Sequence, residues 1–398
     1  MLDLPSSYVV LGLSFDVLVP GFVDAFTGDP TLRAQVPTTP QPADLLAEAR
    51  RLQRALPDAG LAADRAAFLA GQLTGLETSA RLLAGEPVGF VEQVEAYFQA
   101  TPSMGDEAAY LAAHRGLADL LPGDEPLGER YASYRKANEC PPDKLAAAVD
   151  AFSSVLRDRV RTQYPLAETE RVTYEIVGNK PWSGFNYYLG DYASTVAINS
   201  DLPVGLGTLP ALVAHESYPG HHTEHCRKEQ LLAERPEMHI FLVNTPECLM
   251  AEGLADLGLL ALGLETGWGG LAQEIYADLG IRYDGERAEQ IGVAMESLGS
   301  LSQDAALLLH DRGRPADEVV AYLQRWGLQP PERARKSIEF LTDPLWRAYI
   351  STYVEGERLL RGWLDARPAE ERLSVRFGRL LDECLTPADV SERVGKSL

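Results

Sequence analysis

The chain has 398 residues, of which 45% are hydrophobic and 24% charged, proportions that are ordinary for a globular protein with a large core. Its formal net charge of −22 would repel phosphate backbones and anionic lipids. The charge therefore argues against nucleic acid and membrane surfaces as partners, and it is compatible with neutral or cationic ligands.

The opening segment, MLDLPSSYVVLGLSFDVLVPG, contains no lysine or arginine and includes Asp3 and Asp16, which is unlike a signal peptide. No uninterrupted apolar stretch reaches the roughly 18 residues that a membrane span requires. The four cysteines form no Cys-x-x-Cys pair and are few for this length. We therefore expect a reduced, cytoplasmic protein without a membrane span.

The first third of the chain is expected to be helical after an irregular start. Residues 1–40 are rich in proline, glycine and aromatic residues, and we expect them to be irregular. From residue 43 to about residue 161, apolar residues recur at spacings of three and four, which indicates amphipathic helices. Pro-Gly segments separate these helices.

The pattern of residues changes after this helical region. RVTYEIVG (171–178) alternates and is β-branched, and STVAIN (194–199) resembles a second strand. Helical patterns resume after Gly207 and continue to the end. The expected fold is mainly α, in the α+β class, with one small β-sheet. We expect a helical region over 1–165 and a catalytic region over 166–398, packed as one compact unit.

Four of the seven histidines and two carboxylates lie within HESYPGHHTEH (215–225). A catalytic zinc site needs about three His, Glu, Asp or Cys ligands and an open position for water. His215 and Glu216 begin like the His-Glu-x-x-His helix of zinc proteases, but a proline stands four residues after His215. On an ideal helix His215 and His221 would lie roughly 9 Å apart along the axis and on opposing sides.

Pro219 and Gly220 offer a way to bring these histidines together. Proline lacks an N–H donor, and glycine adopts unusual dihedral angles. A π-type bulge over residues 217–220 would absorb two residues and move His221 to the position of an i+4 ligand. Glu216 would then lie beside the ion and act as a general base. His222, the next residue along, is the alternative second ligand.

Two other interpretations use the same residues. His221, Glu224 and His225 match the inverted order H-x-x-E-H, in which the two histidines are four residues apart without a bulge. Alternatively, the histidines lie on a polar helix face and bind nothing, because short motifs also occur by chance.

A third ligand is expected from PECLMAEGLADLG (246–258), an apolar helical pattern that contains Glu252 and Asp256 on one face. Glu252 is suited to bind the metal, and Asp256 to accept a hydrogen bond from a ligand histidine. Carboxylates in an apolar helix are costly to bury unless they are paired or bound to metal. If both instead face solvent, neither has this role.

The pattern His-Glu-x-x-Pro-Gly-His-His followed by Glu-Gly-x-Ala resembles the bacterial DUF885 family, a group of inferred metallopeptidases with gluzincin-like features. The matching residues are His215, Glu216, Pro219, Gly220, His221, His222, Glu252, Gly253 and Ala255. The resemblance is most specific between residues 199 and 256. It implies a large helical zincin-like fold in which Glu252 is the third zinc ligand.

Further candidates concern the substrate. A peptide can be held by adding to a sheet edge, and 194–203 is the candidate edge. The resemblance places an Ile-Asn pair there, matching Ile198 and Asn199, which could equally end an ordinary core strand. His310 and Tyr353 also resemble family positions and are candidates to stabilise the oxyanion. Alternatively, His310 interacts with a helix dipole and Tyr353 is a core aromatic.

These patterns together predict a zinc-dependent peptidase with one Zn²⁺ held by His215, His221 and Glu252. Glu216 would activate water for attack on a peptide or small amide. Two alternatives stay open: a metal-dependent hydrolase of a non-peptide amide or ester, and a non-catalytic metal- or peptide-binding protein. The sequence does not indicate the mode of cleavage or the oligomeric state.

Overall fold

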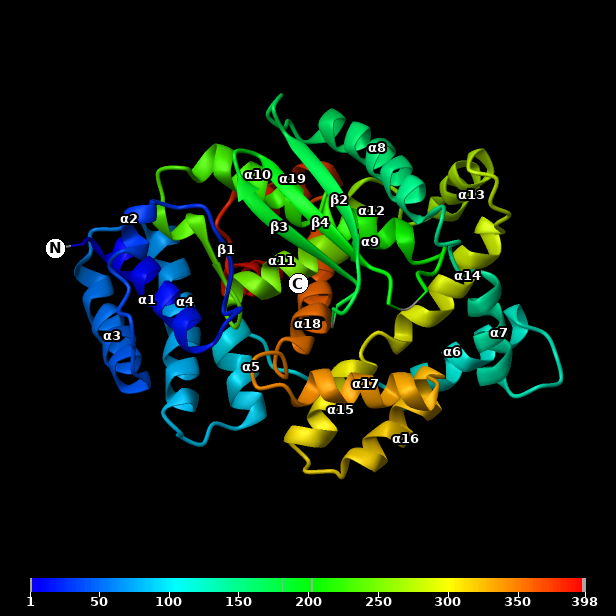
Figure 1. Cartoon of the computed structure of the whole chain (residues 1–398), viewed down its shortest axis with the longest axis horizontal. Helices are drawn as coiled ribbons and strands as arrows, with labels where there is room; N and C mark the ends of the chain where they lie inside the picture. The colour runs from blue at the N-terminus through cyan, green and yellow to red at the C-terminus, as the bar shows by residue number, and fades with distance from the viewer. Residues whose placement is uncertain (1, 181, 202, 396–398) are drawn as a thin grey trace.

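The computed structural model describes residues 2–180, 182–201 and 203–395. It is a mainly helical protein with a small β component, as the sequence predicts. Figure 1 shows a small sheet above the central helices α11 and α18, with the first helices on the left and α13 to α17 on the right and below. In the part of the chain that is described, no helix is both long and apolar enough to cross a membrane.

The elements follow one another in three stretches. Before the three-stranded sheet come α1 (Leu4–Leu18), β1 (Val23–Phe26), α2 (Pro30–Arg33), α3 (Pro42–Ala55), η1 (Leu56–Asp58), α4 (Ala63–Leu83), α5 (Phe90–Phe98), α6 (Glu107–Leu120), α7 (Leu127–Ala137) and α8 (Leu145–Gln163). The middle stretch holds β2 (Arg171–Val177), β3 (Gly184–Gly190), β4 (Ala193–Asn199), α9 (Leu209–Glu216), α10 (His221–Leu232), η2 (Pro236–His239), β5 (Ile240–Leu242), α11 (Pro246–Asp256) and α12 (Gly258–Ala261). The last contains α13 (Trp268–Asp278), α14 (Gly285–Met295), η3 (Glu296–Leu298), α15 (Leu301–His310), α16 (Ala316–Gly327), α17 (Pro331–Thr342), α18 (Ile350–Asp365), α19 (Leu373–Asp382) and α20 (Pro387–Gly395).

The expectation that residues 1–40 are irregular is wrong, because α1 and β1 lie within them. Tyr8, Leu11 and Phe15 of α1 are all buried. At Gly12 the helix approaches β5 so closely that an added Cβ would lie 2.9 Å from Leu242 Cδ1. A helix that is buried on several sides shows no amphipathic stripe, so its periodicity is not visible in the sequence.

The three-stranded sheet has the order β2-β4-β3, with β4 parallel to β2 and antiparallel to β3. β2 and β4 coincide with the two predicted strands, whereas β3, rich in aromatics and glycine, was not predicted. The expectation that 194–203 forms a free edge is wrong, because β4 is paired on both sides. Among the described residues, the unpaired edges of this sheet belong to β2 and β3.

A second sheet, also not predicted, consists of β1 and β5, which pair antiparallel. Their register shifts between Val23 and Ala25, so a bulge is present at Asp24. β1 also contacts β3 of the larger sheet. The first residues of the chain are thereby placed next to the histidine-rich segment.

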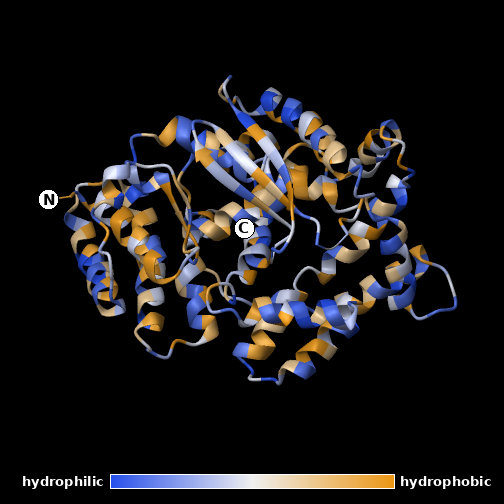
Figure 2. Cartoon of the chain, viewed as in Figure 1, coloured by the Kyte–Doolittle hydropathy of each residue, from blue (hydrophilic) through white to orange (hydrophobic). Residues whose placement is uncertain are grey.

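One continuous hydrophobic core includes residues from both 1–165 and 166–398, among them Leu73 and Leu249. Figure 2 shows hydrophilic and hydrophobic residues interleaved along the outer helix α8, whose apolar residues are buried on one face. The four cysteines are buried and free.

Candidate metal centre

The histidine-rich segment forms two helices that meet at a break. α9 ends at Glu216 and α10 begins at His221, so the expected π-bulge within one continuous helix is wrong. The Gly220 N–H donates to the Ala214 carbonyl at 2.9 Å, which turns the chain back onto α9. A Cβ on Gly220 would lie 1.8 Å from the His215 carbonyl oxygen, so only glycine permits this approach.

The break brings three ligand atoms together from three helices. His215 Nε2 lies 3.2 Å from His221 Nε2 and 3.3 Å from Glu252 Oε2. His221 Nε2 lies 3.6 Å from Glu252 Oε1. The sequence analysis expected these three residues to come together, and in the structure their ligand atoms all lie within 4.8 Å of one another.

Glu252 reaches this position because α11 and α18 cross in backbone contact. An added Cβ on Gly253 would lie 2.4 Å from the Gly356 carbonyl carbon, and one on Gly356 would lie 2.5 Å from the Leu249 carbonyl oxygen. The crossing brings Tyr349, which precedes α18, to Glu252. Its hydroxyl donates to Glu252 Oε1 at 2.6 Å and fixes one oxygen of the carboxylate.

The orientation of His215 is set by Asp256, at the end of α11. His215 Nδ1 lies 2.9 Å from Asp256 Oδ1, the contact that the sequence analysis expected. An ionised carboxylate only accepts hydrogen bonds, so Nδ1–H donates to Asp256 and Nε2 is the nitrogen that faces His221 and Glu252. Carboxylates that bond the second nitrogen of a ligand histidine in this way fix its tautomer in metal sites.

The donor set fits a zinc ion. Glu252 Oε2 is buried and has no hydrogen-bond partner, and the Nε2 atoms of two imidazoles converge on the same point as this carboxylate. Two ligand atoms bound tetrahedrally to zinc lie roughly 3.3 Å apart. The observed separations of 3.2, 3.3 and 3.6 Å agree with that geometry.

The electrostatics also favour a cation between these groups. Burial opposes a charge on His215, but the hydrogen bond with Asp256 and the negative charges of Asp256 and Glu252 raise its pKa well above the usual value. The pKa of His221 is lowered, chiefly by burial. The pKa of Glu252 is lowered although burial opposes this, because His221 and His215 attract its negative charge. The carboxylates of Glu252 and Asp256 therefore attract positive charge to the point where the two imidazoles meet.

Glu216, the expected general base, is buried at the end of α9, close to β3. An added Cβ on Gly184 would lie 2.8 Å from Glu216 Oε1, so the glycine leaves room for the carboxylate. Asn186 Nδ2 donates to the Glu216 carbonyl at 2.7 Å and ties β3 to the end of the helix. Burial raises the pKa of Glu216 to about 7, with His215 opposing and Glu252 adding to the shift.

Of the two candidates for oxyanion stabilisation, the structure brings only Tyr353 to the site. Its ring centroid lies 6.4 Å from that of His215. Burial and the charge of Glu252 raise the pKa of Tyr353 well above its usual value, so the hydroxyl keeps its proton. Its hydroxyl has no hydrogen-bond partner among the described residues.

Both a ring nitrogen and the ring face of His310 are engaged by residues outside the three-residue group, so the structure does not support the expectation that it faces the site. Its Nε2–H donates to the Leu341 carbonyl at 2.6 Å, and its ring stacks on Phe90 with centroids 5.4 Å apart. The residue lies in the last turn of α15, where it joins α15 to α17.

His222, the alternative ligand, points away from the three-residue group. Its Nε2 lies 3.0 Å from Glu170 Oε1 and its Nδ1 lies 2.8 Å from Ser194 Oγ. Burial opposes ionisation of Glu170, but hydrogen bonds from His222 and Tyr218 help to hold its pKa at about 2. Both ring nitrogens of His222 thus serve to anchor α10 to the sheet.

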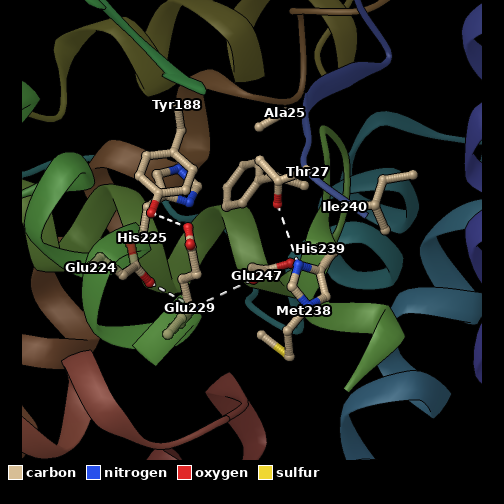
Figure 3. Close-up of a pocket in the computed structure, with 12 residues that line it drawn as sticks. Ala25, Thr27, Tyr188, Glu224, His225, Glu229, Met238, His239, Ile240 and Glu247 are labelled. Atoms are coloured by element: carbon tan, nitrogen blue, oxygen red, sulfur yellow. Dashed lines mark hydrogen bonds and ion pairs between the residues drawn. The ribbon is translucent and has the colours of Figure 1, made fainter. Parts of the chain in front are cut away.

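The inverted H-x-x-E-H interpretation also fails on geometry. The His225 ring stacks on Tyr188, with centroids 4.7 Å apart, and does not join His221. Glu224 pairs with Lys228 at 2.7 Å. These residues line a separate pocket, which Figure 3 shows together with Glu247 and residues of β1.

The predicted substrate role of Ile198 and Asn199 stays a prediction, and the structure places both residues in β4, where Ile198 pairs with Gly184 of β3. Ile198 is fully buried in the central strand. Asn199 Nδ2 donates to the carbonyls of Lys180 and Trp182, both at 2.9 Å. The asparagine thus shapes the chain that leads into β3.

Several residues around the site could not be found from the sequence. Asp24, Glu170 and Gly184 come from segments far from the histidines and match no motif. Tyr349 lies four residues before Tyr353, but no motif marks it. Their positions depend on the packing of β1, β3 and α18, which no local pattern specifies.

The sequence matches no protein-family profile and no curated protein, so the resemblance to DUF885 stays an expectation. Two solved structures are similar in fold, and a third shows a weaker likeness. A candidate lipoprotein from Colwellia psychrerythraea has 13% identity and a TM-score of 0.53, covering 88% of this chain and 66% of that one. A candidate lipoprotein of unknown function from Shewanella oneidensis has 13% identity and a TM-score of 0.53, covering 98% and 82%. The M32 carboxypeptidase from Deinococcus radiodurans R1 has 12% identity and a TM-score of 0.42, covering 98% and 94%.

At this identity the two lipoprotein structures show a shared fold alone, and the likeness to the carboxypeptidase is too slight to carry weight. The chain spans 66% of the length of the Colwellia protein.

Proposed function

We propose that the protein is a zinc-dependent peptidase in which His215, His221 and Glu252 hold one zinc ion. The observation that carries this proposal is the convergence of ligand atoms from three helices, with Glu252 Oε2 buried, without a hydrogen bond and 3.3 Å from His215 Nε2. Two imidazoles and one carboxylate with an open position form a common catalytic zinc set. A structural zinc site would instead have four protein ligands.

A zinc ion held there would lower the pKa of a water molecule and polarise a substrate carbonyl. Glu216 takes the proton of the attacking water and passes it to the leaving amine. This role is supported by its buried carboxylate and by the space that Gly184 leaves for it. The Tyr353 hydroxyl, which retains its proton, donates to the developing oxyanion.

The substrate adds as an extended strand to the outer edge of β3. Asn186 joins this strand to Glu216, so a peptide bound along it passes the general base. Phe185, Tyr187 and Leu189 point to the opposite face of the strand from Asn186, and Phe185 and Tyr187 lie with ring centroids 4.7 Å apart. Backbone pairing with this edge holds substrates of varied sequence, and the aromatic face favours apolar side chains.

The proposal is tested with zinc-loaded protein, a peptide mixture and mass spectrometry of the products. Glu216→Gln should keep one zinc per chain and lose activity by roughly 10²-fold or more, because the general base is gone. Glu234→Gln, which removes an exposed carboxylate, is the matched control and should behave like the native protein. Undiminished turnover by a zinc-bound Glu216→Gln protein would refute the mechanism.

A further inference from the structure

A small pocket is lined by residues of β1, β3, β5, α10 and α11 and is separate from the metal centre, because none of the three proposed zinc ligands lines it. Figure 3 shows Tyr188 of β3 and Thr27 of β1 on two sides of it. Its cavity volume of about 20 Å³ has room for one water-sized group. Thr27 and His239 are only half-buried, so the pocket lies close to the surface.

One carboxylate oxygen of this pocket has no partner. Glu224, which lines the pocket, is only 2% exposed. Its Oε1 lies 2.7 Å from Lys228 Nζ, whereas its Oε2 is buried and has no hydrogen-bond partner. Lys228 is shared with Glu247, whose Oε1 lies 3.4 Å from the same nitrogen. Since buried carboxylate oxygens are nearly always satisfied, Glu224 Oε2 is suited to accept a hydrogen bond from a group that enters the pocket.

The side chains that line the pocket carry more negative than positive charge. The carboxylates of Glu224, Glu229 and Glu247 line it, against the single ammonium group of Lys228. Even if Glu247 takes up a proton, two carboxylates remain against one ammonium group. A water molecule could donate to Glu224 Oε2, but it would leave this excess of charge. A cation that carries N–H groups would both donate to the oxygen and balance the charge.

The walls of the pocket suit an alkylammonium group better than a metal ion. The His225 ring stacks on Tyr188 with centroids 4.7 Å apart and meets Phe241 edge-on at 5.8 Å. Aromatic rings attract ammonium groups, and the apolar side chains of Met238 and Ile240 can pack against an alkyl stem. Calcium, by contrast, takes six or more oxygen ligands. Among the described residues, three or more potential metal-binding side chains converge only at the proposed zinc site.

We propose that this pocket binds a primary alkylammonium group, as carried by a small amine or a lysine side chain. The ammonium group donates to Glu224 Oε2, and its charge balances the carboxylates around it. The alkyl stem lies against the apolar wall of Met238, Ile240 and Phe241. This site needs neither zinc nor peptidase activity, so it stands or falls independently of the proposed function.

The test follows the melting temperature of the full-length protein at constant pH and ionic strength. Methylammonium and butylammonium chloride should raise it along a saturating curve, because a ligand that binds the folded state stabilises it. Tetramethylammonium, which has the charge but no N–H group, and potassium should not. No rise with methylammonium, or an equal rise with tetramethylammonium or potassium, would overturn the inference. Nα-acetyl-lysine amide distinguishes the sources: binding as tight as that of butylammonium identifies a lysine side chain, and weaker binding identifies a free amine.

Variants place the binding in this pocket. Glu224→Gln should bind methylammonium roughly tenfold or more weakly, because the accepting oxygen loses its charge. Ala25→Leu fills the cavity from β1 without changing an ion pair and should abolish binding, so it decides the question even if Glu224→Gln fails to fold. Glu234→Gln removes an exposed carboxylate outside the pocket and should bind as the native protein does. Native affinity in Ala25→Leu, or in a folded Glu224→Gln protein, would overturn the assignment.

Discussion

Replacing Gly253 by alanine should separate α11 from α18 and loosen the zinc site. The new Cβ would lie 2.4, 2.5 and 2.8 Å from the carbonyl carbon, carbonyl oxygen and Cα of Gly356. Carbon atoms normally pack at about 3.5–4.0 Å, and all three contacts are with backbone, so α18 would have to move by roughly 1 Å. Such a shift would lengthen the 2.6 Å bond from Tyr349 to Glu252.

Two opposing effects set the size of this change. Overpacking of a fixed interface costs about 1–3 kcal/mol, and alanine in a helix gains about 1 kcal/mol over glycine. Because no flexible side chain can yield, we take the upper part of the first range and expect a net loss of about 2 kcal/mol in unfolding free energy. Zinc affinity should fall as well, since Tyr349 no longer fixes the ligand carboxylate.

The matched control is Gly362→Ala on α18, where an added Cβ meets nothing within 4 Å. This variant should be as stable as the native protein or more so. Denaturant unfolding with and without zinc measures stability, and competition with a chromophoric chelator measures zinc affinity. If Gly253→Ala matches Gly362→Ala in both measurements, the close crossing of the two helices is not what positions Glu252.

Three further predictions follow from single contacts. Gly184→Ala places a Cβ 2.8 Å from Glu216 Oε1 and should displace this carboxylate. The value of kcat should then fall by up to roughly 10²-fold at unchanged zinc content. A native kcat would contradict the proposed placement of the general base. Asp256→Ala removes the acceptor 2.9 Å from His215 Nδ1 and should weaken zinc binding by about 10–100-fold in chelator competition; native affinity would show that the contact does not orient the ligand. Burial, opposed by Lys228, raises the pKa of Glu247 from 4.5 to about 7. The stability that this carboxyl contributes is therefore present below pH 4.5 and lost as the pH rises through about 7. In Glu247→Gln the fall of the melting temperature between about pH 5 and pH 8 should shrink, and an unchanged fall would show that Glu247 titrates normally.

The sequence predicted those parts of the fold in which a local pattern reflects local burial. The amphipathic helices between residues 43 and 161 and the alternating strand β2 are of this kind. α1 was missed because it is enclosed on several sides, and β3 because its glycines and aromatics follow no simple alternation. β4 was predicted as a strand, but its central position in the sheet was not. That position depends on pairing with β3, a strand that was not predicted.

The same distinction applies to the site. His215, His221 and Glu252 could be predicted as ligands because their residue types and spacings form recognisable motifs. The proline and glycine between the two histidines also indicated a bend in the chain. The sequence could not decide against His222, whose partners Glu170 and Ser194 come from other elements. His310 was a candidate only through a resemblance, and tertiary packing places its ring against Phe90.

The most direct measurement is anomalous diffraction recorded above and below the zinc absorption edge from crystals of the zinc-loaded protein. The account predicts one strong peak between His215 Nε2, His221 Nε2 and the Glu252 carboxylate, at about 2.0–2.2 Å from each ligand atom. No peak at this position, or a peak held by other residues, would contradict it.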